Sequence, residues 1–317
     1  MSERIAVAGH KGMLGRALVR RLRAGGAVPW CPEGDLRNPA DAEAAFAACD
    51  VVLMAAGVGG GIAKNLRVPA DLARDTLRLL TGTLEGARRA GVSRFVWFGC
   101  ACLYPRNGGA PLTLADLWRG PLEPTSQAFA AAQLAGVELT RASHAQYGLQ
   151  ALCLVCPTLY GPGDDFSADG HVVAALIRRF HEARKEGADS VRLWGTGRAR
   201  RQVLYVDDLA DAAVKIAAAP WFPTAIPLLN VAGEGAMCVA GLAAAIASVV
   251  GYEGEIRWTG EGPEGAPAKE LASGVPALFI PTPLEAGLRR TYEWFLANAA
   301  HLPGGQIEKT MAMTEGG

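Results

Sequence analysis

The sequence has no excess charge of either sign. Its 317 residues include 31 Lys and Arg and 31 Asp and Glu, so the formal net charge at pH 7 is zero. A neutral chain exerts no long-range attraction on nucleic acid or on anionic membranes. We therefore expect neither of these partners, although a local basic cluster could still bind a small phosphorylated ligand.

Long apolar runs are also missing. Gly, Pro or charged residues interrupt the longest ones well before the roughly 20 residues that cross a bilayer. The N-terminal sequence MSERIAVAG enters an apolar run directly, without the basic region and cleavage site of a signal peptide. These absences predict a soluble, cytoplasmic protein.

The seven cysteines lack the pattern of a metal site. Cys153 and Cys156 are spaced as CxxC, but they lie in the apolar run ALCLVC, which is typical of a buried strand. Neither a second such pair nor a matched pair of histidines completes a zinc site. Without a secretory signal we expect all the thiols to be reduced and no metal to be bound. The alternative for Cys153 and Cys156 is a redox or metal pair.

The hydrophobic pattern indicates an α/β fold. Half of the residues are hydrophobic and a fifth are charged, as in globular proteins. In the first two thirds of the chain, short apolar runs alternate with amphipathic stretches, which predicts a doubly wound parallel sheet. The expected strands are 5–8, 51–55, 94–98 and 152–156, and the expected helices are 14–23, 70–90 and 127–147.

The pattern changes after Tyr160. A turn cluster, GPGDD, is followed by an expected basic helix at 171–185, a strand at 203–206 and helices at 207–219, 241–251 and 284–298. We expect a Rossmann domain over residues 1–165, with elements returning at about 200–235. A smaller α/β substrate lobe should occupy mainly residues 166–300, and residues 303–317 should form a flexible tail.

A glycine turn follows the first strand. Gly9, Gly12 and Gly15 are spaced as GxxGxxG between that strand and the first helix. Glycines let the backbone approach a pyrophosphate at a helix N-terminus, where free N–H groups favour anions. The turn therefore predicts NADP or NAD as cofactor. The choice between them stays open, because the segment VPWCPE at 28–33 offers neither an Arg nor a clear ribose-binding acid, and Lys11 is the only obvious cation nearby.

Several stretches together resemble the GDP-L-fucose synthases. They are AVAGHKGMLGRALVRRL, FGCACLYP, GPLEPT, YGPGDDF, HVVAALIRRFHEA, WGTG and LYVDDLADA, and the resemblance runs from about residue 5 to residue 298. This family consists of extended short-chain dehydrogenases/reductases. Its members epimerise GDP-4-keto-6-deoxy-mannose at C3 and C5 and then reduce it at C4.

The resemblance implies a proton-transfer pair. Cys102 in CACLYP and His171 before VVAALIRRFHEA match the family's epimerisation residues. A C4 ketone acidifies the protons at C3 and C5, and a thiol and an imidazole can both exchange protons near neutral pH. The alternative is that Cys102 is a small loop residue and His171 a polar residue at a helix start.

The resemblance also identifies an altered reductase centre. Where the family has Tyr-x-x-x-Lys and a Ser, this chain has Phe129, Gln133 and Cys100. Phe has no proton to donate, Gln carries no charge, and a thiol is a weak hydrogen-bond donor. We therefore expect the reductase step to be impaired or lost.

The remaining expected contacts also follow from the resemblance. The resemblance places the cofactor at Gly9, Lys11, Gly12, Met13, Leu14, Gly15 and Leu159. It places the sugar nucleotide, which is GDP-linked in this family, at Arg179, Trp194, Arg201, Glu264 and Lys269. Departures from the family pattern are Thr158 in place of Asn, Gly57 in place of Lys, and Cys31 in place of an Arg that would support a 2′-phosphate. A homodimer is expected by the same analogy.

Three functions are compatible with these residues. The first is epimerisation of a GDP-4-keto-6-deoxy-hexose without efficient reduction. The second is a non-catalytic, nucleotide-binding partner of an active enzyme. The third is an NAD(P)H-dependent reductase with a different proton donor, for which Tyr104 and Tyr147 are the nearest tyrosines in the sequence.

Overall fold

The computed structural model describes residues 3–106, 111–167, 169–220, 222, 227–275 and 278–299. The predicted flexible tail, residues 303–317, lies outside these ranges. Among the helices within them, none is long and apolar enough to span a membrane.

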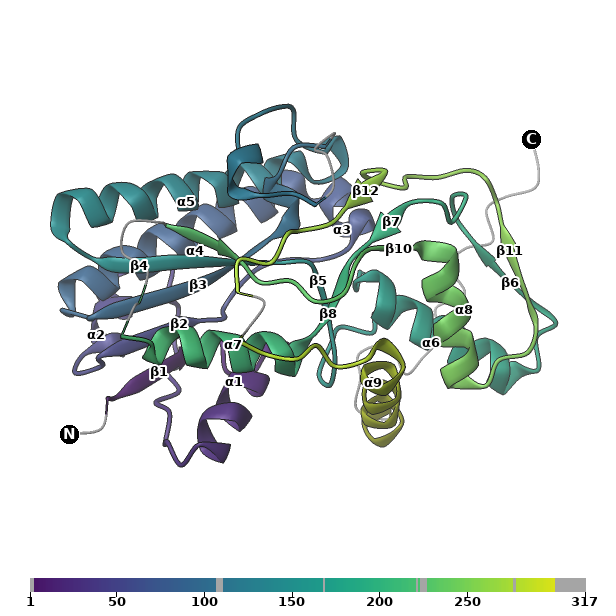
Figure 1. Ribbon diagram of the computed structural model, residues 1–317, viewed down its shortest axis with the longest axis horizontal. Coiled ribbons are helices and arrows are strands. Elements are labelled where there is room, and N and C mark those ends of the chain that lie inside the picture. Colours follow the sequence, from purple (N-terminus) through teal and green to yellow (C-terminus); the bar gives the residue numbers. More distant parts are fainter. Residues whose placement is uncertain are drawn as a thin grey trace.

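A five-stranded parallel sheet forms the centre of the larger part of the molecule (Figure 1). Its strands, in spatial order, are β1 (Ile5–Ala8), β2 (Val51–Met54), β3 (Arg94–Cys100), β4 (Gln150–Cys156) and β9 (Leu228–Asn230). All residues of β2 and nearly all of β4 are buried. Such continuous apolar strands are expected where helices cover both faces of a parallel sheet.

Helices cover the two faces of this sheet separately (Figure 1). Side chains of successive strand residues point to opposite faces, so Ala6 and Ala8 of β1 belong to one core and Val7 to the other. The first core is covered by α2 (Pro39–Phe46), α4 (Pro69–Arg89) and α5 (Gln127–Tyr147). The second is covered by α1 (Met13–Ala24) and α7 (Val206–Ala218). The predicted doubly wound α/β fold is therefore confirmed.

A third hydrophobic core lies at the other end of the molecule (Figure 1). It is enclosed by α6 (Val172–Glu186), α8 (Val239–Val250) and α9 (Leu284–Asn298), beside the parallel pair β6 (Ser190–Leu193) and β11 (Glu255–Trp258). Phe180 stacks on Tyr252 inside it, with ring centroids 5.4 Å apart.

Short strands run between the five-stranded sheet and this third core (Figure 1). They are β5 (Thr158–Tyr160) paired with β8 (Val203–Tyr205), and β7 (Arg200–Arg201) between β10 (Met237–Cys238) and β12 (Ala268–Lys269). The remaining elements are the helix α3 (Ile62–Arg67) and the 3₁₀ turns η1 (Ala101–Leu103), η2 (Leu114–Asp116) and η3 (Pro124–Ser126).

The segment after α1 pairs with β1 through a single bridge. Trp30 pairs with Ala6 beside β1, and its flanking residues Pro29 and Pro32 lack the N–H groups that a longer ladder needs. From Trp30 the chain crosses to β2 on the opposite side of β1. The strand order therefore reverses at β1, which in doubly wound folds marks the crevice where ligands bind.

Candidate functional site

The glycine turn lies at the carboxyl end of β1, at this reversal point. Gly9 has φ +80°, and a Cβ there would lie 2.4 Å from the Ala56 backbone nitrogen, just after β2. A Cβ on Gly15 would lie 2.1 Å from the Gly9 carbonyl oxygen. Both positions therefore require glycine for the turn to pack against β2 and α1.

Gly12 is different, because its environment within the protein tolerates a side chain. It is the N-cap of α1, and a Cβ there would meet only the Gly9 carbonyl, at an ordinary 3.5 Å. The first amides of α1, at Met13 and Leu14, are those that an α-helix cannot bond internally. The turn thus presents an open backbone surface and free N–H groups, which suits the pyrophosphate of a dinucleotide.

An ion pair lies over this turn. Lys11 Nζ is 2.8 Å from Glu33 Oε2, and His10 Nε2 is 3.4 Å from Glu33 Oε1. The hydrogen bond from Lys11 lowers the pKa of Glu33, which is therefore ionised. Glu33 comes three residues after the Trp30 bridge, where dinucleotide-binding folds place the residue that contacts the adenine ribose. The sequence pattern missed Glu33 because it gave no sign that the strand would end at Trp30.

The other predicted cofactor residue, Leu159, is half-buried in β5, where its side chain packs against the second core. The loop that follows β5 returns to α1. A Cβ on Gly163 would lie 3.7 Å from the Met13 Cα atom and 3.6 Å from Arg16 Cδ. The residues after Tyr160 therefore lie beside the predicted phosphate-binding turn.

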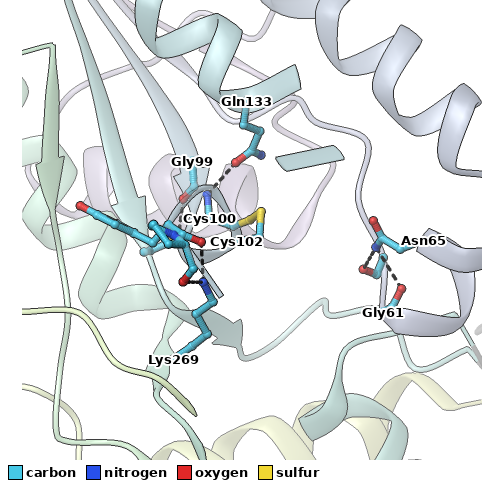
Figure 2. Close-up of a disulfide and its surroundings, with 11 residues drawn as sticks. Gly61, Asn65, Gly99, Cys100, Cys102, Gln133 and Lys269 are labelled. Carbon is cyan, nitrogen blue, oxygen red and sulfur yellow. Dashed lines mark hydrogen bonds between the residues drawn. A yellow bond between two sulfur atoms is a disulfide. The ribbon is translucent and has the colours of Figure 1, made fainter. Parts of the chain in front are cut away.

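Cys100 and Cys102 form a disulfide at the end of β3 (Figure 2). The prediction that all seven thiols are reduced is wrong for this pair, because β3 ends at Cys100 and the tight η1 turn brings the two Cα atoms to 5.3 Å. The other five cysteines are free. Cys153 and Cys156 are buried in β4, and burial raises the pKa of both thiols, as expected for structural cysteines.

Gln133 holds the backbone at this disulfide. Its buried side-chain Oε1 accepts a hydrogen bond of 2.9 Å from the Cys100 backbone N–H (Figure 2). Phe129 is half-buried one helical turn earlier on α5 and so lies on the same side of that helix. The structure therefore brings Gln133 to Cys100 and places Phe129 on the same side of α5, at the three positions that the resemblance aligns with reductase residues.

Neither of the neighbouring tyrosines is available as a replacement acid. Tyr104 is fully buried and donates its hydroxyl proton to Asn230 Oδ1 at 2.7 Å, and burial raises its pKa. Tyr147 lies at the far end of α5, where its ring contacts the guanidinium of Arg88.

His171 is the N-cap residue of α6, but its side chain does not cap the helix. The segment before it packs on the start of α3, where the Gly61 N–H donates to the Asp169 carbonyl at 2.8 Å. The residue is exposed to solvent, but the surrounding protein partly desolvates its imidazole. This desolvation lowers the pKa of His171, so the imidazole is neutral at pH 7. A neutral imidazole can accept a proton.

Two half-buried cations lie beside the cysteine segment. Lys269 Nζ donates to the Tyr104 and Pro105 carbonyls at 2.6 and 2.9 Å (Figure 2), and burial lowers its pKa to about 8. Arg201 Nη1 donates to the Ala266 carbonyl at 2.7 Å, and among the described residues no carboxylate comes within 4 Å of its guanidinium, although Glu123 and Glu264 lie near enough to act on its charge. Positive charges held by carbonyls rather than by carboxylates suit an anionic ligand.

The 264–266 loop brings this part of the site together with α3. A Cβ on Gly265 would lie 3.1 Å from Arg201 Nη2, 3.3 Å from Ile62 Cδ1 and 3.6 Å from Thr125 Oγ1. Arg201, α3 and η3 therefore converge on one loop. Glu264 itself anchors this loop, because its carboxylate accepts a hydrogen bond of 2.7 Å from the Thr196 hydroxyl.

Arg179 and Trp194 are open to solvent. Arg179 is exposed on α6 and makes no hydrogen bond or ion pair with any residue that the structure describes. Trp194 follows β6 and is 48% exposed. Both side chains are therefore free to meet a ligand.

Sequence reasoning missed two buried carboxyl groups. Glu123 Oε2 has no hydrogen-bond partner among the described residues, and the Arg106 guanidinium is 3.5 Å away. Asp164 Oδ2 also lacks a partner within the described chain, and burial raises the pKa of Asp164 to about 7. No sequence signal separates Asp164 from Asp165 in the GPGDD turn, because only packing determines which of the two is buried.

Comparisons with known proteins agree with this geometry. Residues 5–226 match the model of the NAD dependent epimerase/dehydratase family. The chain is 36% identical over 310 residues to GDP-L-fucose synthase 1 of Arabidopsis thaliana, covering 95% of each chain. It is also 36% identical over 319 residues to GDP-L-fucose synthase of Escherichia coli (strain K12), covering 95% of this chain and 99% of the relative.

Solved structures show the same likeness. A GDP-6-OMe-4-keto-L-xylo-heptose reductase from C. jejuni superposes with a TM-score of 0.84 at 25% identity, over 94% of this chain and 98% of the other. A GDP-L-fucose synthetase from Naegleria fowleri, bound to NADP, has the same fold, with a TM-score of 0.82 at 20% identity over 95% and 96% of the two chains. The chain belongs to the NAD dependent epimerase/dehydratase family and, within it, groups with the GDP-L-fucose synthases.

Proposed function

We propose that this protein epimerises a GDP-4-keto-6-deoxy-hexose at C3 or C5, or at both, with the C4 reductase step impaired. One observation carries the proposal. The proton-transfer residues Cys102 and His171 are kept, whereas Phe129, Gln133 and Cys100 replace the three reductase groups in one place. Curated relatives named as GDP-L-fucose synthases support the substrate class.

The chemistry needs one base and one acid on opposite faces of the sugar. The C4 ketone stabilises the carbanion that forms when a proton leaves C3 or C5. We assign the base to His171, whose lowered pKa keeps it neutral at pH 7, and the acid to the reduced Cys102 thiol. After each inversion, His171 carries the extra proton and Cys102 is a thiolate, and exchange with water restores both groups.

Other residues would hold the two ligands. The glycine turn at residues 9–15 fits the pyrophosphate of NAD(P), which supplies a hydride in reductases of this kind. Arg201 and Arg179 would bind the substrate diphosphate, because guanidinium groups form paired hydrogen bonds with phosphate oxygens. Trp194 would contact the nucleotide or sugar with its exposed ring. Cytoplasmic location and a homodimer remain parts of this proposal.

Deuterium exchange tests the proposed function directly. Reduced protein should introduce solvent deuterium into C3 or C5 of a GDP-4-keto-6-deoxy-hexose, as measured by NMR or mass spectrometry, without a matching oxidation of NADPH or NADH. Absence of deuterium at both carbons would reject the epimerase.

The disulfide gives one reason to keep a second candidate, a non-catalytic partner that binds a nucleotide sugar. A sulfur bonded to another sulfur cannot transfer a proton, so the oxidised form lacks the acid. Such a partner should copurify with a catalytic chain and raise its activity. Deuterium exchange by the isolated, reduced protein would exclude this candidate.

We further propose that Glu33 favours NAD over NADP. Its carboxylate can accept a hydrogen bond from a ribose 2′-hydroxyl, whereas it would repel a 2′-phosphate and it already pairs with Lys11. Titration followed by protein fluorescence should show tighter binding of NADH than of NADPH. Glu33→Gln should tighten NADPH binding by about three- to tenfold, since exposed charges interact weakly.

Asp35→Asn is the matched control for this prediction. Asp35 is an exposed acid two residues away that pairs with Arg37. The control variant should keep the wild-type preference. Tighter binding of NADPH than of NADH by the wild-type protein would refute the role of Glu33.

A further inference from the structure

We propose that Cys100 and Cys102 form a thiol–disulfide exchange site, at which small-molecule thiols and disulfides switch the protein between an active dithiol and an inactive disulfide. The effect on activity rests on the proposed function, because it requires Cys102 to transfer protons. The exchange chemistry itself rests only on the cysteine pair.

The fold preorganises this pair. β3 ends at Cys100, and the η1 turn begins at the next residue, so the two cysteines lie on either side of a tight bend. Their Cα atoms are 5.3 Å apart, within the range of about 4.4–6.8 Å that a disulfide spans without backbone movement. Gln133 fixes the start of the bend by accepting the Cys100 N–H. The bend therefore holds the two residues at a separation that suits a disulfide.

Access distinguishes this pair from the CxxC pair in β4. Cys100 and Cys102 are both half-buried, whereas Cys153 and Cys156 are 0% and 5% exposed. Burial raises the pKa of both β4 thiols, which disfavours the thiolate that must attack a disulfide. Thiol–disulfide exchange should therefore occur at Cys100 and Cys102 and not at Cys153 and Cys156, although only the latter pair has the CxxC spacing.

A half-buried cation lies beside the cysteine segment. Lys269 donates to the carbonyls of Tyr104 and Pro105, two and three residues after Cys102 (Figure 2). Nearby positive charge favours a thiolate over a thiol. The same charge thus assists the attack of the reduced pair on an external disulfide.

The chemistry balances with one external disulfide. A Cys thiolate attacks the small-molecule disulfide, releases one thiol and leaves a mixed disulfide on the protein. The second Cys thiolate then attacks the protein-bound sulfur and releases the second thiol. The protein loses two electrons and two protons, and the external disulfide gains them. An external dithiol reverses both steps and restores the Cys102 thiol.

This assignment explains the cysteine at position 100. A Ser-to-Cys difference weakens hydrogen bonding to a substrate. It also supplies the second sulfur that an isolated Cys102 would need for an internal disulfide. The replacement that weakens the reductase centre therefore makes the proton-transfer residue sensitive to redox conditions.

Two independent readouts test the proposal. The full-length protein is equilibrated with mixtures of reduced and oxidised dithiothreitol and then alkylated with N-ethylmaleimide under denaturing conditions. Peptide mass spectrometry should show that Cys100 and Cys102 lose both labels together as the mixture becomes oxidising. Deuterium incorporation into a GDP-4-keto-6-deoxy-hexose should fall in parallel by about 10²-fold or more, the usual effect of losing a general acid or base.

Matched variants complete the test. Cys100→Ser should abolish the dependence of the deuterium-exchange rate on redox conditions, whatever its basal rate. Cys238→Ser, which changes a free cysteine at the start of α8, should retain the full dependence. The switch would be overturned if a 100–102 disulfide failed to form under any mixture. It would also be overturned if the rate of deuterium exchange stayed the same after the disulfide had formed. If the disulfide forms and breaks with the dithiothreitol mixture but neither form of the protein exchanges deuterium, the result would support the thiol–disulfide site and reject the epimerase.

Discussion

Replacing Cys102 with alanine should reduce deuterium exchange at C3 and C5 by about 10²–10⁴-fold in fully reduced protein, the range expected when a positioned acid or base is lost. Tyr104 cannot replace the thiol because its hydroxyl is bonded to Asn230, and the Cys153 and Cys156 thiols are buried in β4. Binding of GDP should change little, because Arg201 and Arg179 are untouched. NMR detection of deuterium under single-turnover conditions, with GDP binding measured by calorimetry, separates the two effects.

Cys31→Ala is the control for this loss. Cys31 is a free, half-buried cysteine in the segment after the Trp30 bridge. Its removal should leave exchange at the wild-type rate. Exchange by Cys102→Ala at a rate within a factor of about three of wild type would show that another group supplies the proton and would remove Cys102 from the mechanism.

Restoring the reductase residues should have the second large effect. The triple substitution Cys100→Ser, Phe129→Tyr and Gln133→Lys introduces a phenolic acid, a cation one helical turn away that lowers its pKa, and a hydroxyl donor. We expect NADH or NADPH oxidation with a 4-keto sugar nucleotide to rise by about 10²–10⁴-fold over wild type. Absorbance at the nicotinamide band measures the gain.

The single substitution Phe129→Tyr is the informative comparison. It supplies the acid without the cation, so its gain should be much smaller than that of the triple variant. Gln133→Lys alone removes the acceptor for the Cys100 N–H, so thermal unfolding should be followed for each variant. Efficient NAD(P)H oxidation by the wild-type protein would contradict the proposed loss of reduction and would favour a reductase with a different acid.

Local sequence patterns predicted the long elements well. The helices at 127–147 and 284–298 have the predicted limits, and β1 is also as expected. Their periodicity reflects which face each element buries, and this is written in the local sequence. The short strands β7, β10 and β12 were missed, because two-residue strands carry no periodic signal and form only where distant segments meet.

The sequence by itself determined the family, the doubly wound fold and the glycine turn, and it predicts the replacement of all three reductase residues, because each of these is carried by residue type and spacing. Only the tertiary structure decided what the replaced residues do. Gln133 lies 33 positions from Cys100, and its hydrogen bond to that residue exists because α5 packs beside the end of β3. Packing likewise buries Asp164, commits the Tyr104 hydroxyl to Asn230 and brings Lys269 under the cysteine segment. The disulfide depends on the sequence and on the fold together. The sequence supplies two cysteines, and the bend at the end of β3 brings them to each other.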